Sequence, residues 1–351
     1  MKAVKTLLEN AEKLRQMLIR SGLFEKAMKI KRGRQYIYIP IKRDVSKDKL
    51  DSLLRRAPGS PDVVNVSLDR LPERKSLKEN LSKRLPREHL DILPSSFDIV
   101  GDIITVELDR RLYKYEKEIG NALLRLNPQA RVVARKAGSH RGELRTQRVK
   151  IIAGEKRRVT VYKENNCIFK LNVEKVYFSP RLATERKRIA GLVKPGEQVL
   201  VMFSGCAPYP IVIAKSSEAG RIFGIELNRT AHKYGLENLE LNSISNVSLI
   251  CGDVRRVIPK LKARFDRIVM PLPKTASDFL PYAFRAAKKS CVIHLYDFAD
   301  EVDMETQPVK EIDMACRRHK IRYNVQRIIK CGQYAPRAYR VCVDFVISSS
   351  I

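Results

Sequence analysis

The stretch that decides the fold spans residues 197–228 and reads EQVLVMFSGCAPYPIVIAKSSEAGRIFGIELN. An apolar run over 199–203 stops at a loop of small residues, a helix-compatible segment follows, and a second apolar run over 222–225 ends on Glu226. This order predicts a strand, a tight loop, a helix and a second strand with a carboxylate at its tip. Such a carboxylate can accept hydrogen bonds from both hydroxyls of an adenosine ribose, so the stretch predicts a pocket for a nucleoside cofactor.

The loop in this stretch argues against a dinucleotide cofactor. It lacks the G-x-G-x-x-G pattern of a phosphate cradle, and Pro208 has no amide hydrogen to donate to a pyrophosphate. A further apolar run over 247–251 leads to Asp253, whose carboxylate is placed to bind an adenine amino group. A cofactor that contains adenosine but no phosphate fits these features best, and S-adenosylmethionine is the common one.

The charge of the chain predicts a polyanionic partner. Lysine and arginine number 69 against 39 acidic residues, which gives a formal net charge of +30. RNA or DNA phosphates fit this charge better than anionic lipid, because no apolar segment approaches the roughly 20 residues that span a membrane. The amino terminus lacks a hydrophobic signal region, and the seven cysteines are scattered without a C-x-x-C pair. We therefore expect a cytoplasmic protein with reduced cysteines and no metal site.

The length of 351 residues exceeds one ordinary core and predicts several domains. We expect a small amino-terminal α/β module over 1–62, an α+β RNA-binding domain over 63–173 and an α/β domain over 174–351. In the first module, apolar positions at helical spacing predict a helix over 3–20. In the second, the basic loop 131–148 is expected to lie along RNA phosphates, with a disordered surface loop as the alternative.

The last domain shows the pattern of an α/β fold, because strands and helices alternate from about residue 174 to the end of the chain. This alternation predicts an open, mostly parallel sheet with helices on both faces. Ligands of such sheets bind beyond the carboxyl ends of the strands. We therefore expect the cofactor where the loops 204–208, 226–228, 253–255 and 271–274 converge.

Short motifs between about residues 95 and 340 together resemble one family, the tRNA guanine-37 N1-methyltransferases of the archaeal and eukaryotic type. They are GDIITVEL, GELRTQR with IIAGEKR after it, KVYFSPRLATERKRI, VMFSGCAPYPI, GIELN, GDVR, PLPK and YAPRAYR. The resemblance implies a Rossmann-like class I methyltransferase domain at the carboxyl end, S-adenosylmethionine as cofactor and tRNA as partner. It also implies that the first domain contacts the outer corner of tRNA and that the other two hold its anticodon arm. We expect a monomer, because no coiled-coil pattern or apolar interface stripe occurs.

Methylation of guanine N1 requires two protein groups. N1 carries a proton near neutral pH, so a base must remove it while the methyl group is attacked in line, and negative charge then spreads to O6. A carboxylate for the proton and a cation for O6 are the minimum. The positions that match the base and the cation of the family are Glu185, in TERKR, and Arg145, in GELRT. Without the resemblance, Glu185 reads as an exposed helix carboxylate and Arg145 as a phosphate ligand.

The resemblance also extends to residues around the cofactor and the base. Tyr177 is either a core aromatic residue or a stacking platform for the flipped guanine, and Arg181 is expected to meet the methionine carboxylate. The residues expected to bind the cofactor are Arg181, Phe203, Gly205, Ala207, Glu226, Leu227, Asp253, Val254 and Pro271.

Four positions depart from the family pattern. Pro271 stands where relatives often have asparagine, so an amide that bonds the guanine is missing, although the Pro271 carbonyl can still accept a hydrogen bond. Val201 replaces a usual aspartate, and Glu226 replaces the more frequent aspartate at the ribose. Ala207 replaces the second glycine of the loop, which limits positive φ there.

These departures leave two further functions open. A wyosine-pathway enzyme on the same nucleotide would either methylate a tricyclic guanine derivative or transfer the aminocarboxypropyl group of the same cofactor, and the altered PLPK loop leaves room for that change. A catalytically inactive tRNA-binding protein is the third reading, which Val201, Ala207 and Pro271 support.

Overall fold

The computed structural model describes the chain except residues 72–74, 139–141, 143, 273, 336 and 349–351. The chain forms two compact units, Met1–Ser76 and Leu77–Ile351. Part of the basic loop and Pro273 of the PLPK motif lie outside the described residues. The division into three domains at residues 62 and 173 stays a prediction.

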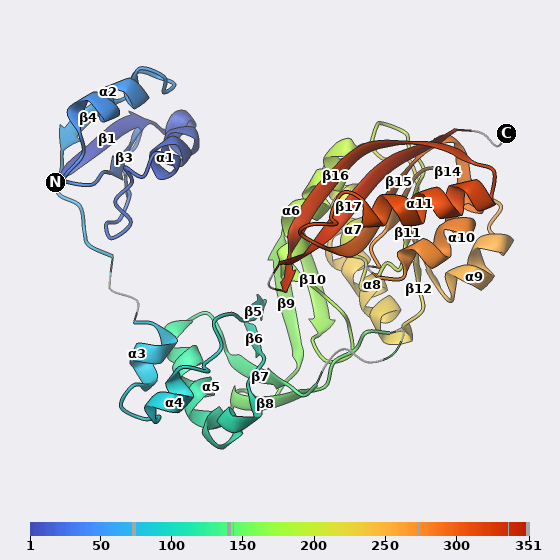
Figure 1. Cartoon of the computed structure of the whole chain (residues 1–351), viewed down its shortest axis with the longest axis horizontal. Helices are drawn as coiled ribbons and strands as arrows, with labels where there is room; N and C mark the ends of the chain where they lie inside the picture. Colours follow the sequence, from blue (N-terminus) through green and yellow to red (C-terminus); the bar gives the residue numbers. More distant parts are fainter. Residues whose placement is uncertain (72–74, 139–141, 143, 273, 336, 349–351) are drawn as a thin grey trace. The chain divides into compact units, whose positions relative to one another are not determined.

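The first unit is a four-stranded sheet with two helices on it (Figure 1). Its strand order is β2-β3-β1-β4, and the elements are β1 (Lys2–Leu7), α1 (Ala11–Arg20), β2 (Lys31–Arg32), β3 (Tyr36–Pro40), α2 (Lys47–Leu54) and β4 (Asp62–Asn65). The helix predicted over 3–20 is therefore wrong in its first part. Central strand β1 pairs with β3 on one side and β4 on the other. Val4 is buried in this strand, and it would also lie on the apolar face of a helix. The apolar spacing was therefore ambiguous, and pairing with the two neighbouring strands determines the structure of the segment.

The second unit begins with a four-stranded sheet of order β5-β6-β7-β8. Its elements are α3 (Leu77–Leu81), α4 (Arg87–Leu90), β5 (Asp98–Val100), β6 (Ile103–Val106), a 3-10 helix (Arg110–Tyr115), α5 (Glu116–Leu126), β7 (Val132–Lys136) and β8 (Val149–Gly154). Helix α5 packs closely on β8, because a Cβ atom at Gly120 would lie only 2.8 Å from the Cβ of Ala153. The strands predicted around 102–108 and 149–152 and the helix predicted over 113–126 are confirmed.

The remainder of this unit contains a seven-stranded sheet of order β13-β12-β11-β14-β15-β17-β16. The strands are β11 (Val199–Met202), β12 (Ile222–Glu226), β13 (Val247–Cys251), β14 (Phe265–Met270), β15 (Ala287–Asp300), β16 (Arg322–Ala335) and β17 (Ala338–Ser348). The pairs from β13 to β15 are parallel, and β17 is antiparallel to both β15 and β16. The predicted, mostly parallel α/β sheet is thus confirmed.

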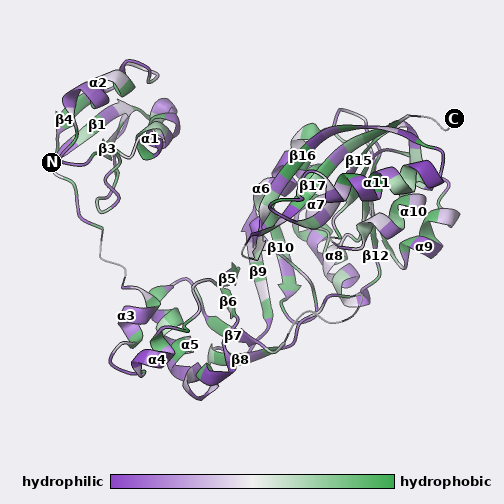
Figure 2. Ribbon diagram, viewed as in Figure 1, coloured by the Kyte–Doolittle hydropathy of each residue, from purple (hydrophilic) through white to green (hydrophobic). Residues whose placement is uncertain are grey.

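Helices cover both faces of this sheet, as the sequence predicts. They are α6 (Ala183–Leu192), α7 (Pro208–Ser216), α8 (Arg229–Leu241), α9 (Val254–Val257), α10 (Leu280–Ala286) and α11 (Gln307–Arg318). Successive residues of β11 divide between two cores: Val199 and Val201 pack in the core that contains residues of α6, α7 and α8, whereas Leu200 and Met202 pack in the core that contains residues of α10 and α11. Figure 2 shows hydrophobic and hydrophilic residues alternating along the helices, which is the pattern of helices with one face on a core.

A hairpin of β9 (Val159–Glu164) and β10 (Cys167–Asn172) is fixed to α8 by two asparagine side chains. Asn238 accepts a hydrogen bond from the Lys170 amide over 2.7 Å, and Asn242 accepts one from the Ile168 amide over 2.8 Å. Both side-chain amides also donate back to carbonyl groups of β10. The asparagines therefore satisfy the open backbone edge of β10 as a paired strand would. No described helix is both long and apolar enough to cross a membrane.

Candidate active site

A cavity of about 590 Å³ lies at the carboxyl ends of four adjacent parallel strands. Its wall includes residues at the ends of β11, β12, β13 and β14 or in the loops just after them, among them Phe203, Gly205, Glu226, Asp253 and Pro271. The predicted convergence of the loops after these strands is confirmed. We call this space the first cavity.

The loop after β11 brings its backbone to the cavity by adopting positive φ angles. Phe203, Gly205 and Ala207 have φ values of 61°, 58° and 67°. Ala207 is fully buried and precedes the first residue of α7, so it supports the loop from behind, and it is not among the residues that line the cavity. Alanine thus occupies a left-handed position for which glycine is the usual residue.

Glu226 connects the first two loops. Its carboxylate accepts hydrogen bonds from the amides of Gly205, over 2.6 Å, and Asn228, over 2.7 Å. Burial raises the pKa of Glu226, and these backbone hydrogen bonds oppose the rise because they favour the charged form. The carboxylate also lines the first cavity together with Leu227. A carboxylate has more acceptor sites than two amides occupy, so Glu226 can still accept ribose hydroxyl groups.

Asp253 and Val254 line the same cavity from the loop after β13. Asp253 caps α9 by accepting the Arg255 amide over 2.8 Å, and its carboxylate also accepts the Nε hydrogen of Arg255 over 2.8 Å. The side-chain hydrogen bond from Arg255 lowers the pKa of Asp253 against the opposing effect of burial. An adenine amino group would have to share this carboxylate with Arg255.

A second cavity of about 760 Å³ adjoins the first, and Arg145, Tyr177 and Lys274 line both. The Arg145 guanidinium lies 5.8 Å from the centre of the Tyr177 ring. The Tyr177 hydroxyl accepts a hydrogen bond over 2.8 Å from Arg340, which also lines the second cavity. Tyr177 is half-buried and lines both cavities, and its role as a stacking platform stays a prediction.

Arg340, a residue on the wall of the second cavity, has a buried hydrogen-bond donor without a partner in the described part of the chain. Arg340 is only 9% exposed, and its buried Nε has no hydrogen-bond partner among the residues that the structure describes. A buried donor of this kind favours a ligand that brings an acceptor. Arg181 lines this cavity and not the first, and its guanidinium donates to Asp98 over 2.6 Å. Its expected contact with a methionine carboxylate stays a prediction.

Glu185 lies apart from both sets of lining residues. It is 5% exposed, so it is not an exposed helix carboxylate, but it is absent from the walls of the first and second cavities. Its carboxylate accepts two hydrogen bonds from Arg188, each of 2.7 Å, and one from the Tyr296 hydroxyl of 2.6 Å. Leu182, which precedes α6, and Arg186 of α6 do reach the first cavity. The structure therefore joins Arg145 and Tyr177 and places Glu185 behind the cavity wall.

The partners of Glu185 belong to a larger buried ionic cluster, which consists of Glu185, Arg188, Tyr296, Asp344, His294, Arg267 and Glu197. Arg188 donates to Asp344 over 2.6 Å, and Asp344 lies 2.6 Å from Nδ1 of His294. Nε2 of His294 lies 2.8 Å from an Arg267 nitrogen, and Arg267 is paired with Glu197. Because Arg267 can only donate, Nε2 must accept, and the Nδ1 hydrogen goes to Asp344.

The protonation states of the cluster follow from this geometry. Burial lowers the pKa of His294, with Arg267 and Arg188 acting in the same direction against Asp344. Burial would raise the pKa of Asp344, but hydrogen bonds from His294 and Arg188 hold it below its ordinary value. His294, Cys342 and Asp344 place possible metal ligands within 4.8 Å of one another, yet guanidinium groups already contact each of them. The absence of a metal site stays a prediction.

Three family descriptions match the chain. The TRM5/TYW2 methyltransferase domain matches residues 160–325, the TYW2 N-terminal domain matches 77–157, and the tRNA methyltransferase 5 N-terminal domain matches 3–49. The tRNA (guanine(37)-N(1))-methyltransferase Trm5b of Pyrococcus abyssi is 36% identical over 353 aligned residues, which cover 99% of each chain. This chain belongs to the TRM5/TYW2 methyltransferase family.

Other members of the TRM5/TYW2 family differ in how much of the chain they match. A solved complex of aTrm5 and tRNALeu is 30% identical, has a TM-score of 0.69 and covers 99% of both chains. The tRNA 4-demethylwyosine(37)-methyltransferase Taw21 of Saccharolobus solfataricus is 34% identical and covers 76% of this chain and 98% of its own. These matches confirm the resemblance that the motifs indicated. They also confirm the expected Rossmann-like fold.

Sequence reasoning missed several residues of this TRM5/TYW2 site. Arg340 ends the YAPRAYR motif, so the motif itself was a signal. His294 and Asp344 interrupt the apolar runs of β15 and β17. An ionisable side chain inside a buried strand indicates that it has a hydrogen-bonding or ion-pair partner, because burying it alone is costly. Their identity as partners of each other and of Arg188 had no signal in a single sequence.

Proposed function

We propose that the protein is a tRNA (guanine-37 N1)-methyltransferase that uses S-adenosylmethionine. One observation carries the proposal: Arg145 and Tyr177 form a wall shared by two cavities, one beside Glu226 and Asp253 and the other beside the unpaired Nε of Arg340. A donor site and an acceptor site for group transfer must adjoin in this way. The relative that matches the chain from end to end carries the name of this reaction.

The first cavity fits the cofactor. Glu226 would accept the ribose hydroxyls, Asp253 would accept the adenine amino group, and Phe203, Gly205 and Pro271 line the same cavity. Leu227 and Val254 would contact the adenine ring, and Ala207 would keep the loop in its left-handed turn. When bound, S-adenosylmethionine supplies a methyl group on a positively charged sulfur. Calorimetric titration of the protein with S-adenosylmethionine tests this fit without requiring turnover.

The second cavity would receive the guanine base. Tyr177 would stack on the flipped base, and the Arg145 guanidinium would stabilise the negative charge that develops on O6. Arg340 lines the same cavity, has a buried Nε without a partner among the described residues, and donates to the hydroxyl of Tyr177. Arg340 thus serves both to orient the platform and to bind an acceptor of the incoming nucleotide.

Glu185 is our proposed general base for the N1 proton. Its support is its burial as a carboxylate on the helix whose residue Arg186, together with Leu182 just before the helix, reaches the first cavity. Because Glu185 lies behind the wall, the proposal requires its side chain to turn away from Arg188 when the base enters. Tyr296 then serves as a positioning residue that holds the carboxylate until that moment.

The experiment is nucleoside analysis of a reacted tRNA. An unmodified tRNA transcript with guanosine at position 37 is incubated with the protein and methyl-labelled cofactor, then digested and examined by mass spectrometry. We expect labelled 1-methylguanosine, lost when position 37 is changed to adenosine. Label on another base, or label that persists in the position-37 variant, would contradict the proposal.

A wyosine-pathway activity on the same nucleotide is the second candidate. Pro271 on the wall of the first cavity favours it, because the guanine-binding amide of many relatives is missing, and Taw21 shares 34% identity with most of the chain. Cofactor labelled in its carboxyl group decides the transfer type, since retained label on RNA means aminocarboxypropyl transfer. A third candidate, an inactive tRNA-binding protein, requires that calorimetry detects no cofactor binding while tRNA binding is normal.

We also propose that the protein acts in the cytoplasm as a monomer and contacts tRNA through three parts, 1–62, 63–173 and 174–351. The support for a reducing compartment is that all seven cysteines are free. Light scattering with and without tRNA tests the monomer.

A further inference from the structure

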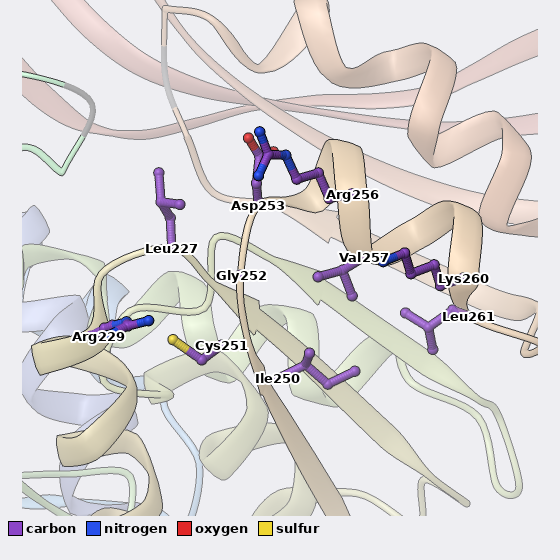
Figure 3. A pocket seen from close by; sticks show the side chains of 10 residues that line it. All are labelled: Leu227, Arg229, Ile250, Cys251, Gly252, Asp253, Arg256, Val257, Lys260 and Leu261. Carbon is purple, nitrogen blue, oxygen red and sulfur yellow. The ribbon is translucent and has the colours of Figure 1, made fainter.

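A groove of about 860 Å³ shares Leu227, Gly252 and Asp253 with the wall of the first cavity, and its other lining residues have no part in the proposed reaction. It is formed by the end of β13, the start of α8 and the segment that contains α9 (Figure 3). Figure 3 shows Cys251 and Ile250 of β13 between Arg229 on one side and Val257, Lys260 and Leu261 on the other. We call this space the edge groove.

The edge groove combines an apolar floor with a cationic rim. Leu227, Ile250, Val257 and Leu261 supply apolar surface, and all but Leu227 are partly buried. The rim carries three exposed cations, Arg229, Arg256 and Lys260.

The cations of the rim are unpaired. Among the residues that the structure describes, the side chains of Arg229, Arg256 and Lys260 make no hydrogen bond or ion pair. The one carboxylate on the wall, Asp253, is already paired with Arg255 over 2.6 Å. In contrast, Arg188, Arg186 and Arg267 elsewhere in this unit are each paired with carboxylates. Arg256 acts on the nearby Asp253 carboxylate and helps to lower its pKa, so among the described residues the positive charge of the rim that no acidic side chain offsets is that of Arg229 and Lys260.

We propose that the edge groove binds a short stretch of the RNA backbone of the substrate, with phosphates on the three cations and ribose or base faces on the apolar floor. This chemistry follows from the groove: phosphates satisfy exposed guanidinium and ammonium groups, and the apolar floor matches the sugar and base surface that alternates with phosphates. The inference rests on the proposed RNA substrate and adds a contact on the cofactor side of the methyltransferase domain. RNA bound in the edge groove would also contact Leu227 and Asp253, which line the first cavity as well.

The test compares two triple variants with the same loss of charge. The groove variant carries Arg229→Ala, Arg256→Ala and Lys260→Ala. The matched control carries Lys233→Ala, Lys262→Ala and Arg264→Ala, which change exposed cations on the same segments that do not line the groove. Binding of an unmodified tRNA transcript is measured at several salt concentrations without S-adenosylmethionine, so that no methyl transfer occurs.

We expect the groove variant to bind tRNA about tenfold or more weakly near physiological salt and to lose about two to three units of the salt slope, one for each phosphate contact. The control variant should change the slope by less than about one unit. Calorimetric affinity for S-adenosylmethionine should be the same in both variants and the wild type. Equal losses in the two triple variants would overturn the proposal, because a diffuse basic surface predicts them.

A second measurement uses the exposed thiol of Cys251 in the groove. Saturating tRNA should slow alkylation of Cys251 by iodoacetamide in the wild type and in the control variant, but not in the groove variant. Peptide mass spectrometry reports this rate at each cysteine. Unchanged alkylation of Cys251 in the wild type under saturating tRNA would contradict the proposal. Neither readout depends on turnover, so failure of the groove and failure of guanine-37 methylation are separate results.

Discussion

The guanidinium group of Arg188 donates to both carboxylate oxygens of Glu185, each over 2.7 Å, and also holds Asp344 of β17 over 2.6 Å. Helix α6 is thereby tied to the antiparallel end of the sheet through charged groups. The Arg188 pair therefore fixes the position of the Glu185 carboxylate.

The first prediction concerns Glu185→Gln. Glutamine keeps the shape and one acceptor for Arg188 but cannot take the N1 proton, so we expect the methylation rate at saturating substrates to fall about 100-fold or more. Affinity for tRNA should change less than about twofold, since Glu185 lines neither cavity. Single-turnover kinetics and tRNA binding give the two numbers.

Tyr296→Phe is the matched variant for this prediction. If Tyr296 only positions Glu185, its loss should lower the rate by about tenfold or less. A loss as large as that of Glu185→Gln would contradict direct proton transfer to Glu185 and indicate a route through the phenol.

The second prediction concerns Arg340→Gln. The substitution removes the guanidinium that holds the Tyr177 hydroxyl and the buried Nε donor of the second cavity. We expect the KM for tRNA to rise and kcat to fall, with kcat/KM lower by about 100-fold, the typical cost of a lost charged hydrogen bond in a closed site. The affinity for S-adenosylmethionine should not change, because Arg340 does not line the first cavity. Arg337→Gln, three residues away and exposed, is the control. Weaker cofactor binding in Arg340→Gln would contradict the assignment of Arg340 to the base side.

The third prediction is a pH dependence of stability from His294. Burial lowers the pKa of the folded imidazole, so the unfolded chain binds the proton more readily below about pH 6.5. The free energy of unfolding should therefore fall as the pH is lowered, by up to about 1.4 kcal/mol per pH unit. The decrease starts near the pKa of His294 in the unfolded chain and ends near its pKa in the folded protein. Asp344, Arg188 and Arg267 are the charged groups that face the ring; against the effect of burial, hydrogen bonds hold the pKa of Asp344 below its ordinary value, and carboxylate partners raise the pKa of Arg188.

His294→Asn is the variant for this measurement, because asparagine can donate to Asp344 but does not titrate. Urea unfolding gives the free energy of unfolding of both proteins at about pH 7.5 and pH 5.5. The difference in this free energy between wild type and variant should be smaller by about 1 kcal/mol or more at the lower pH. A gap that is independent of pH would mean that His294 keeps its ordinary pKa when folded.

The fourth prediction concerns the asparagine that fixes the β9–β10 hairpin. Asn238 is fully buried, accepts from the Lys170 amide and donates to the carbonyls of Lys170 and Cys206. Asn238→Ala leaves these backbone groups without partners, so we expect the free energy of unfolding to fall by about 3 kcal/mol. Asn246→Ala, which removes 3.1 Å and 3.4 Å bonds at a partly exposed site, should cost less than about 1 kcal/mol. Similar costs for both variants in urea unfolding would contradict the role of Asn238.

The sequence predicted those parts of the fold that local pattern determines. Strands such as 199–203 and 222–225 are apolar runs that end at small or acidic residues, so their ends and the carboxylate of Glu226 could be placed in advance. The segment 2–7 could not, because its strand depends on β3 and β4, which pair with it from later in the chain.

The long-range contacts of the buried ionic cluster around Glu185 could not be predicted for a similar reason. Arg188 and Asp344 are 156 residues apart in the sequence, and only the sheet order that places β17 beside β15 brings Asp344 to His294. Whether Glu185 faces a cavity or lies behind its wall is a matter of side-chain packing, which motif spacing does not specify.

The fifth prediction concerns Ala207, which the loop holds at a φ of 67°. Ala207→Gly removes left-handed strain of about 1 kcal/mol. It also removes a buried methyl group worth about 0.8 kcal/mol and raises the conformational entropy of the unfolded chain, and both of these changes lower stability. The net change in unfolding free energy should therefore stay within about 1 kcal/mol.

Ala207→Val keeps the strain, adds a β-branched side chain at positive φ and crowds α8, where a Cβ at Gly235 would already lie 3.5 Å from the Ala207 Cβ. We expect Ala207→Val to cost about 3 kcal/mol and to weaken S-adenosylmethionine binding, because the loop can no longer present Gly205 to Glu226. Urea unfolding and calorimetry measure both effects, and a valine variant as stable as the wild type would show that the left-handed turn is not required.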